Sequence, residues 1–568
     1  MKQWQLKQRA TESDSSKVFP HLPRAISEVL VARGLDGEDS LQCFLNPPHR
    51  LPHCPMRLSG MKAAIQRLQR ALPASNPTQQ SGELVGIVGD FDVDGITGTA
   101  VLVEGLSLLG IESIPYVPHR VSEGHGLSSE SVKYLADQGV SLIVTVDCGV
   151  SSVEEAALAA QLGIDVIVTD HHVPPAQPPE VTAIINPAVP GDEYPFQHLC
   201  GAGLAFKLMQ GLYKIQGKKV PEPLLELVAL GTIADVVPLV DENRYLVREG
   251  LERLGKTERP GLIELYQNSG LTGKPITAES VAFQIAPRLN AAGRMGHAAD
   301  SLRLLTTRNA EEAAALAQQL ESQNRERQEL TRHLDTLATS YVEGLEELPP
   351  FILFSNPMMT PGIAGLVAGR LAERYQRPAV ALATLEDGTY LASGRSIPSF
   401  NLIGAFNACS DLFIRHGGHA QAAGFTLAAE NLPKLEARLN ELALSALDGA
   451  DLLQVVNIDA AMGLEDISEE LLQWLGQLEP FGEGNPRPTF ITEKLQVKQT
   501  WKMGAQGQHL KLLVTDGRRS IPVLAFNRAD EWSEDVKKID LVYSIEVDYW
   551  RGKKQTNLLA VDFRPVER

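Results

Sequence analysis

Cysteine is scarce in this chain, and its few cysteines show no pairing pattern. Five occur among 568 residues. None of them form a CxxC pair, and an odd, dispersed set suits a reducing compartment better than a disulfide scaffold. The same spacing argues against a structural zinc site, which needs closely spaced ligands. The five are Cys43, Cys54, Cys148, Cys200 and Cys409.

Long apolar segments are absent as well. No run of about 18 uncharged apolar residues occurs, so the sequence offers no membrane-spanning helix. The opening segment, MKQWQLKQRATESDSS, lacks the apolar stretch of a secretory signal. We therefore expect a cytoplasmic protein without a membrane segment.

An excess of basic residues, the usual mark of a polyanion-binding protein, is also missing. The net charge is -18, with 43% hydrophobic and 21% charged residues, as in ordinary globular proteins. The charge is uneven, however: from Lys498 to Arg568 there are 13 Lys and Arg against 10 Asp and Glu, a net +3, which leaves -21 on the rest. The acidic part needs its own explanation.

The length and the pattern of apolar residues predict several domains. Short Val- and Ile-rich runs alternate with helix-like stretches after about residue 84, which predicts a parallel sheet with helices on both faces. A long helix, a second α/β unit and a run of short strands typical of a small β-barrel follow. We expect an N-terminal helical cap and linker, the sheet domain, the connecting helix, the second α/β domain and the barrel at 1–80, 81–308, 309–345, 346–448 and 449–568.

Acidic and imidazole groups follow several of the predicted strands. Ligands of an open parallel sheet bind at the carboxyl ends of its strands, so these groups are expected to converge. Each Asp alone could be a turn former, but four such segments together favour a metal site. In IVGDFDVDG, alternation along an extended chain would put Asp92 and Asp94 on one face. The segments contribute Asp90, Asp92, Asp94, Asp147, Asp170, His171, His172 and Asp235.

The string DFDVDG also fits the start of an EF-hand calcium loop. That loop needs a bidentate Glu at its twelfth position, and counting from Asp90 leads to Val101. The preceding segment has a strand pattern, and an EF-hand would have a helix there. We therefore reject the EF-hand.

Mixed carboxylate and imidazole ligands favour Mn²⁺, although Mg²⁺ suits the carboxylate-rich position. Two cations about 3.5 to 4 Å apart would activate water and stabilise both oxygens of a phosphodiester displacement. Asp147 is the candidate bridging ligand. His172 either contacts the scissile phosphate or orients a ligand, and the sequence leaves both roles open.

These segments resemble a known family. GDFDVDG, VTVDCG, TDHH and GTIADVV resemble the four motifs of the DHH phosphoesterases. Four further segments, PRLNAAGR, SGRSIPSFNL, GGHAQAAGF and LEPFGEGNP, resemble the bacterial RecJ exonucleases. The resemblance implies a 5′-to-3′ exonuclease that acts on single-stranded DNA in the bacterial cytoplasm, in recombination and repair.

The resemblance also implies roles for individual residues. The metal ligands fall on Asp92, Asp94, Asp147, His171 and Asp235, and the catalytic groups on Asp90, Asp147 and His172. A 5′-phosphate pocket falls on Arg120, Ser393 and Arg395, where arginine forks suit phosphate oxygens. Phosphate contacts fall on Gly417, Gly418 and His419, while Arg288, Asn290 and Arg294 contact either the strand or the neighbouring domain.

The terminal barrel resembles an OB fold, which guides single strands by basic and aromatic side chains. Candidate contacts there are Trp501, Lys511, Trp550, Arg551 and Lys553, although tryptophan in a small barrel is more often part of the core.

Two departures from the RecJ pattern occur, at MMTPGIAGLVAGRL and at His125. The first puts in question one polar contact expected in the second domain, and the second weakens a stacking surface. Neither affects the predicted metal ligands.

Three functions remain in competition. The leading one is an exonuclease that needs a single strand with a 5′ end and works as a monomer, with single-strand-binding protein and a helicase as candidate partners. The second is a phosphodiesterase for short oligonucleotides or cyclic dinucleotides, and the third is a scaffold without catalytic activity. The complete set of ligands argues against the scaffold, and the cap and barrel argue against the small substrates.

Overall fold

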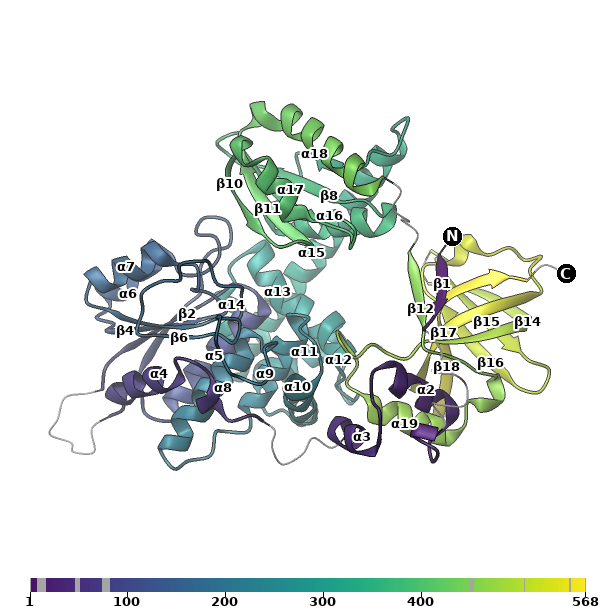
Figure 1. Cartoon of the computed structure of the whole chain (residues 1–568), viewed down its shortest axis with the longest axis horizontal. Helices are drawn as coiled ribbons and strands as arrows, with labels where there is room; N and C mark the ends of the chain where they lie inside the picture. Colours follow the sequence, from purple (N-terminus) through teal and green to yellow (C-terminus); the bar gives the residue numbers. More distant parts are fainter. Residues whose placement is uncertain are drawn as a thin grey trace. The chain divides into compact units, whose positions relative to one another are not determined.

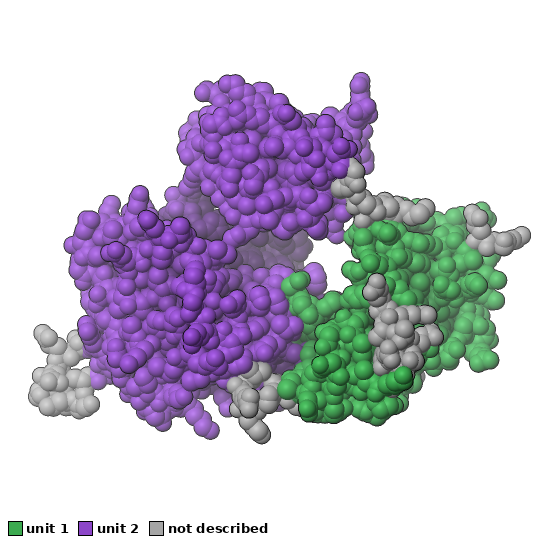
Figure 2. All heavy atoms as spheres, viewed as in Figure 1, with its two compact units in different colours: residues 1–51, 453–568 green, residues 52–452 purple. Residues whose placement is uncertain are grey.

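The structure is a computed structural model that describes residues 2–7, 17–45, 52–73, 82–448, 454–504, 506–550 and 553–566. The chain forms two compact units: residues 1–51 with 453–568, and residues 52–452 (Figures 1 and 2). Within the described ranges, no helix is both long and apolar enough to cross a bilayer.

The larger unit contains a five-stranded parallel sheet with the order β3-β2-β4-β5-β6. Residues of β2 and β4 are buried on both faces, which explains their continuous apolar runs. Val144 and Val146 belong to the core on one face of the sheet, and Ile143 to the core on the other. The predicted parallel sheet is confirmed. Its strands are β2 (Val85–Gly89), β3 (Ser113–Tyr116), β4 (Leu142–Val146), β5 (Asp165–Thr169) and β6 (Ala183–Ile185).

Helices cover both faces of this sheet. Apolar residues of α5, α8 and α9 fill the larger core, and those of α6 and α7 fill the smaller one. Further helices pack around the larger core (Figure 1). The helices are α4 (Met61–Leu68), α5 (Val93–Ser107), α6 (Ser129–Asp137), α7 (Val153–Gln161), α8 (Gly201–Ile215), α9 (Leu224–Ala234), α10 (Asp241–Leu254), α11 (Pro260–Ser269), α12 (Ala278–Ser280), the π-helical turn Val281–Ile285, α13 (Ala286–Met295) and α14 (Ala299–Thr306).

The predicted connecting helix is α15 (Ala310–Glu343). Asn309 caps it, because its side chain accepts hydrogen bonds from the N–H groups of Glu311 and Glu312. Leu316 and Leu320 in its first half belong to the core of the parallel-sheet domain, whereas Leu334 and Val342 pack in the core of the next domain. One rigid helix is therefore anchored in two cores.

The second α/β domain has a mixed sheet with the order β10-β11-β9-β8-β7, in which only β7 and β8 run parallel. α15 and α16 pack on one face, and α17 and α18 pack on the other. Its elements are β7 (Ile352–Ser355), α16 (Pro361–Tyr375), β8 (Ala379–Thr384), β9 (Tyr390–Arg395), α17 (Leu402–Ala408), β10 (Phe413–Gly418), β11 (Ala422–Leu427) and α18 (Leu432–Leu447).

The smaller unit contains the expected barrel. Its strands follow the order β14-β15-β16-β18-β17, and pairing of β14 with β17 closes the ring. β13 pairs with β14, and β1 pairs with β12, both in parallel. The elements are β1 (Gln3–Leu6), α2 (Arg24–Ala32), α3 (Glu38–Leu45), β12 (Val455–Ile458), β13 (Ala460–Ala461), α19 (Glu469–Leu478), β14 (Phe490–Met503), β15 (His509–Thr515), β16 (Ser520–Ala525), β17 (Lys538–Trp550) and β18 (Lys553–Pro565).

The segment 1–80, expected to form one cap and linker, is divided between the two units. Ile26 and Leu30 of α2 are buried in the barrel core, whereas Ile65 and Leu68 of α4 are buried in the parallel-sheet core. The reason is that each amphipathic helix is covered by a different domain, which helical periodicity alone does not specify.

A buried ion pair links α8 to the start of α10. Lys207 Nζ donates to Glu242 Oε1 at 2.8 Å and to the carbonyl oxygen of His53, and the Tyr194 hydroxyl donates to Glu242 Oε2 at 2.7 Å. Both charged side chains are 0% exposed. Neither charge can be solvated if its partner is removed.

Lys207→Met should therefore lower the free energy of unfolding of the larger unit by about 3 kcal/mol, because it leaves Glu242 buried and unpaired. Chemical denaturation would measure the loss. The matched control is Lys256→Met, which removes an exposed pair with Glu252 and should leave the midpoint unchanged. Equal midpoints for the two variants would contradict the prediction.

Candidate metal centre and phosphate-binding residues

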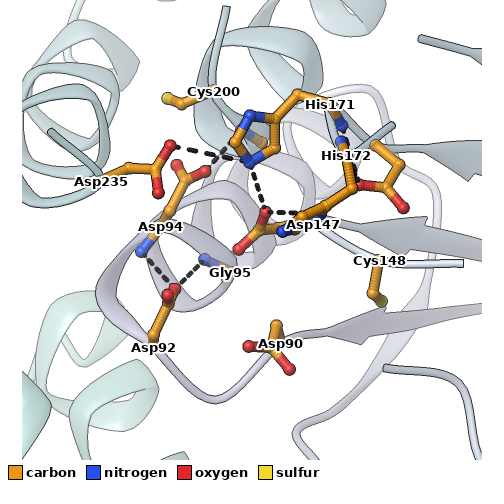
Figure 3. Close-up of polar contacts among 12 residues, drawn as sticks. Asp90, Asp92, Asp94, Gly95, Asp147, Cys148, His171, His172, Cys200 and Asp235 are labelled. Carbon is orange, nitrogen blue, oxygen red and sulfur yellow. Dashed lines mark hydrogen bonds and ion pairs between the residues drawn. The ribbon is translucent and has the colours of Figure 1, made fainter. Parts of the chain in front are cut away.

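The candidate metal centre lies at the carboxyl ends of adjacent parallel strands. Asp90 follows β2, Asp147 follows β4, and Asp170 to His172 follow β5. Because β2, β4 and β5 are neighbours in the sheet, these side chains converge as expected (Figure 3).

Asp92 and Asp94 are held by two different sets of backbone N–H groups. Asp92 is the N-cap of α5, and its Oδ1 accepts from the N–H groups of Asp94 and Gly95 at 2.9 and 3.1 Å. Asp94 accepts from the N–H groups of Gly201 and, at 2.9 Å, Ala202, where the positive end of the α8 dipole lies. The expectation of one extended face was wrong, because the helix already begins at Val93.

Asp147 and Asp235 have fewer polar contacts. Asp147 has a φ of 60°, a left-handed conformation that is strained for a non-glycine residue, and its Oδ1 lies 3.0 Å from His171 Nε2. Asp235 is the C-cap of α9, and its Oδ2 lies 3.6 Å from His171 Nε2. Among the described residues, this buried Oδ2 has no hydrogen-bond partner.

Three groups of side chains bring their ligand atoms within 4.8 Å of one another: Asp90 with Asp92 and Asp147; Asp94 with His171 and Asp235; and Asp147 with His171 and His172. The groups overlap at Asp147 and His171. Carboxylate oxygens suit both Mn²⁺ and Mg²⁺, and the added imidazole favours Mn²⁺. The unpartnered oxygen of Asp235 fits a cation as well, so the residues present suit a divalent metal.

The crowding of carboxylates changes their acidity. Burial and the neighbouring Asp90 and Asp94 raise the pKa of Asp92 to about 6, and burial with Asp94 and Asp92 raises the pKa of Asp235 to about 9. The same causes raise the pKa of Asp147 well above its usual value. Bound cations would reverse this balance by neutralising the carboxylates.

The two adjacent histidines have different environments. Burial lowers the pKa of His171, which favours the neutral imidazole that a metal ligand must be. A 2.7 Å hydrogen bond to Asp170 Oδ1 raises the pKa of His172 to about 9. Asp170 also accepts from the N–H groups of both histidines and of Val150, so it positions this segment.

The glycine-rich loop of the second domain faces this centre. The His419 ring stacks on the His172 ring with centroids 6.4 Å apart and planes 7° apart. Gly418 has a φ of 133°, and a Cβ there would lie 2.5 Å from the carbonyl oxygen of Ala422. Gly417 would meet nothing within 4 Å. The loop therefore brings His419 to the metal centre across the domain boundary.

Three arginines form what we call the arginine cluster: Arg120, Arg294 and Arg395. The Arg120 guanidinium lies 4.5 Å from the centroid of the Phe91 ring, and Arg395 Nη1 lies 3.4 Å from Ser393 Oγ. Burial and the charges of Arg120, Arg327 and Arg395 lower the pKa of Arg294 to about 9. The cluster therefore joins residues of both α/β domains in one positive field.

Several predicted contacts have other environments. Arg288 forms a 2.7 Å ion pair with Glu321 of α15, so its guanidinium already has an acid partner within the protein. Asn290 is half-buried on α13. In the barrel, Trp501 is 44% exposed and pairs in register with Lys511. The predicted contacts Arg551, Trp550 and Lys553 lie outside the described residues or side chains.

Some residues of the centre carried no signal in the sequence. A Cβ at Gly231 would lie 2.7 Å from Asp94 Oδ1, and a Cβ at Gly365 would lie 2.9 Å from Ser393 Oγ. Only the close approach in space shows that glycine is required at these positions.

At the first departure from the RecJ pattern, Thr360 is at the N-cap position of α16, but its side chain makes no capping hydrogen bond. At the second, His125 Nδ1 lies 3.3 Å from Asp90 Oδ2.

Comparison with known families agrees with this geometry. The DHH family N-terminal domain matches residues 84–232, the DHHA1 domain matches 348–444, and the RecJ OB domain matches 458–562. A parallel-sheet domain with this ligand set and a DHHA1 partner defines a DHH phosphoesterase, a class of hydrolases.

Full-length relatives narrow the class. The single-stranded-DNA-specific exonuclease RecJ of Salmonella typhimurium is 35% identical over 592 residues that cover all of both chains. RecJ of Bacillus subtilis is 38% identical over 548 residues, 95% of this chain and 68% of the relative. The chain belongs to the RecJ family of single-stranded-DNA-specific exonucleases.

Solved structures are similar over the whole chain. RecJ from Thermus thermophilus in complex with Mn²⁺ has a TM-score of 0.83 and 31% identity, and covers 100% of this chain and 80% of that one. The complex of the same protein with Mg²⁺ has a TM-score of 0.77 and 29% identity, and the match covers 100% of this chain and 79% of that one. Both metals expected from the donor set therefore occur in solved RecJ structures.

Gly201→Ala should weaken Mn²⁺ binding by at least about tenfold, because its Cβ would lie 2.5 Å from Asp147 Cβ and 3.0 Å from Asp94 Oδ2. Gly203→Ala is the matched control on the same helix, where the nearest atom would be 3.4 Å away. Calorimetric titration with Mn²⁺ would measure both affinities. Equal affinities would contradict the proposed packing of α8 on the ligands.

The metal-free protein should lose stability as the pH rises. The folded-state pKa values of Asp92 and Asp235, about 6 and about 9, lie above the unfolded value, so the folded state binds protons that the unfolded state releases. Stability is therefore lost between about pH 4 and 9. Thermal unfolding in chelator and in Mn²⁺ should show a larger metal-induced rise of the midpoint at pH 8.5 than at pH 6. A rise that does not depend on pH would contradict the prediction.

Proposed function

We propose that this chain degrades single-stranded DNA in the 5′-to-3′ direction with two divalent cations, Mn²⁺ or Mg²⁺. The observation that carries the proposal is the position of the arginine cluster beside the overlapping ligand groups. Arg120 of the cluster interacts electrostatically with Asp90 and Asp92. A site that recognises a strand end and a site that hydrolyses a linkage are thereby adjacent.

Asp94, His171 and Asp235 would hold one cation, and Asp90, Asp92 and Asp147 the other. Asp147 suits the bridging role because it belongs to the second group and its Oδ1 lies 3.0 Å from Nε2 of His171, a member of the first group. Bound cations would supply water of lowered pKa and neutralise phosphate charge. The protein contributes the fixed positions of these ligands, which the N–H groups of α5 and α8 hold in place.

His172 would contact the scissile phosphate. With a pKa of about 9 it is cationic at neutral pH, and its ring is half-exposed beside His419. A cationic imidazole can donate a charge-assisted hydrogen bond to a phosphate oxygen. Asp170 orients the ring for this contact and is not itself in one of the ligand groups.

The arginine cluster with Ser393 would bind the 5′-terminal phosphate. A terminal phosphate carries more negative charge than a phosphodiester, and guanidinium groups bind it bidentately. Gly365 permits the approach of Ser393 and Arg395 to α16. Because this cluster lies next to the metal ligands, binding of the end would place the first linkage at the cations.

The barrel would guide the rest of the single strand. Trp501 and Lys511 are neighbours in adjacent strands, and Phe526, which is 55% exposed, packs edge-on against His509. Exposed aromatic rings beside basic groups can stack bases and attract the backbone. The proposal extends to a monomer acting in recombination and repair in the bacterial cytoplasm, with single-strand-binding protein and a helicase as partners.

One degradation assay tests the polarity and the role of the arginines. With strands labelled at either end, the wild-type protein in Mn²⁺ should release the 5′ label first and should prefer a 5′-phosphate to a 5′-hydroxyl. Arg395→Gln should lower the ratio of activity on 5′-phosphate strands to activity on 5′-hydroxyl strands about tenfold, because a charge-assisted contact is lost. Asp147→Ala, which removes a proposed metal ligand, is the negative control and should show no hydrolysis.

Two outcomes of this assay would overturn the proposal. Early release of the 3′ label would reject the polarity. Faster cleavage of a dinucleotide than of a long strand would favour the short-oligonucleotide phosphodiesterase.

A further inference from the structure

Two side chains on one face of α15 have buried polar atoms without a partner in the described part of the chain: Gln323 Oε1 and Arg327 Nε. The two residues are four positions apart and so lie one above the other on the helix. Arg327 donates from Nη2 to Asn324 Oδ1 at 2.9 Å. A buried donor and a buried acceptor left unsatisfied are costly, so the pair is suited to a polar ligand.

Arg327 also lacks a counter-ion. Among the described residues it forms no ion pair with a carboxylate, whereas its neighbours Arg288 and Arg370 pair with Glu321 and Asp335. Burial and the charges of Arg370 and Arg288 oppose the charge of Arg327 and lower its pKa. A half-buried guanidinium with cationic neighbours and no acid partner favours an anion.

This face of α15 adjoins the arginine cluster. Gly296, two residues after Arg294, approaches Gln323 so closely that a Cβ there would lie 2.8 Å from Gln323 Nε2. Arg294 in turn donates to the carbonyl oxygen of Gly362 at 2.8 Å, which ties the end of α13 to α16. Gln323 therefore lies close to the end of α13 that carries Arg294, and the charge of Arg327 acts on Arg294.

We propose that Gln323 and Arg327 form a second phosphate subsite beside the arginine cluster, and that it takes the second phosphate of a 5′-diphosphate or 5′-triphosphate end. The inference rests on the proposed function of the arginine cluster. A guanidinium donates to phosphate oxygens in a planar fork, and the Gln323 amide can rotate to present its NH₂ group. Neither residue is part of the metal centre.

The position of the subsite relative to the metal centre favours a phosphate that extends the 5′ end over a phosphate within the strand. Arg120 interacts with Asp90 and Asp92, whereas the charges that act on Arg327 are those of Arg370 and Arg288. Arg294 of the cluster interacts with both Asp92 and Arg327, so it connects the ligand groups to the subsite. The scissile linkage must lie at the cations, so a group beyond the cluster is reached more readily by an extension of the 5′ end.

The test is equilibrium binding of strands of one sequence that end in a 5′-hydroxyl, a 5′-monophosphate or a 5′-triphosphate. The full chain carries Asp147→Ala to prevent hydrolysis. Without a further change, the triphosphate strand should bind about tenfold more tightly than the monophosphate strand. Arg327→Gln should abolish that difference, and thermal unfolding of the variant should match its parent.

The matched control is Arg325→Gln, which removes an exposed arginine of the same helix that pairs with Glu321. It should retain the triphosphate preference. If Arg327→Gln weakened monophosphate strands but not thymidine 5′-monophosphate, the phosphate bound there would come from the strand itself, and the assignment to an extended 5′ end would be wrong.

Two results would overturn the subsite: unchanged binding of all three strands by Arg327→Gln, or an equal loss for all three that includes the hydroxyl end. Failure of the proposed function has a different signature. In that case the parent protein, which carries Asp147→Ala alone, would bind the monophosphate strand no better than the hydroxyl strand.

Discussion

Repulsion between buried carboxylates is the constraint on which the larger unit is built. Five aspartates and two imidazoles approach one another at the carboxyl ends of the parallel strands, and backbone N–H groups compensate only some of the negative charges. Asp92 and Asp94 receive two backbone N–H groups each, which stabilises their charged forms. Burial and the neighbouring carboxylates nevertheless raise the pKa values of Asp92, Asp147 and Asp235. Bound cations would neutralise the remaining charge of these carboxylates.

This constraint determines how the surrounding helices pack. The N–H groups that hold Asp94 are at the start of α8, so α8 must begin at the metal centre, and Gly201 and Gly231 must have no side chain there. Asp235 ends α9, which packs with α5 and α8 in one apolar core. The apolar interior therefore fixes the relative positions of three helices whose ends carry the polar groups of the centre.

The sequence predicted the parts of this arrangement that repeat locally. Alternating apolar runs indicated the parallel sheet, and acidic groups after three strands indicated where ligands meet. What it could not indicate depends on contacts between distant segments. Asp92 and Asp94 separate because α5 begins between them, and Arg288 pairs with Glu321 across two helices. The division of segment 1–80 has the same cause, since an amphipathic helix does not specify which core covers it.

The two α/β domains share the residues that would recognise a strand end. Arg120 and His172 come from the parallel-sheet domain, while Arg395 and His419 come from the second domain. Because α15 is buried in the cores of both, the distance between these residues is set by one continuous helix. Recognition of the end and hydrolysis of the first linkage would then be coupled by rigid geometry. A substrate that fills only one domain's contacts would lose binding energy needed to hold its phosphodiester at the cations.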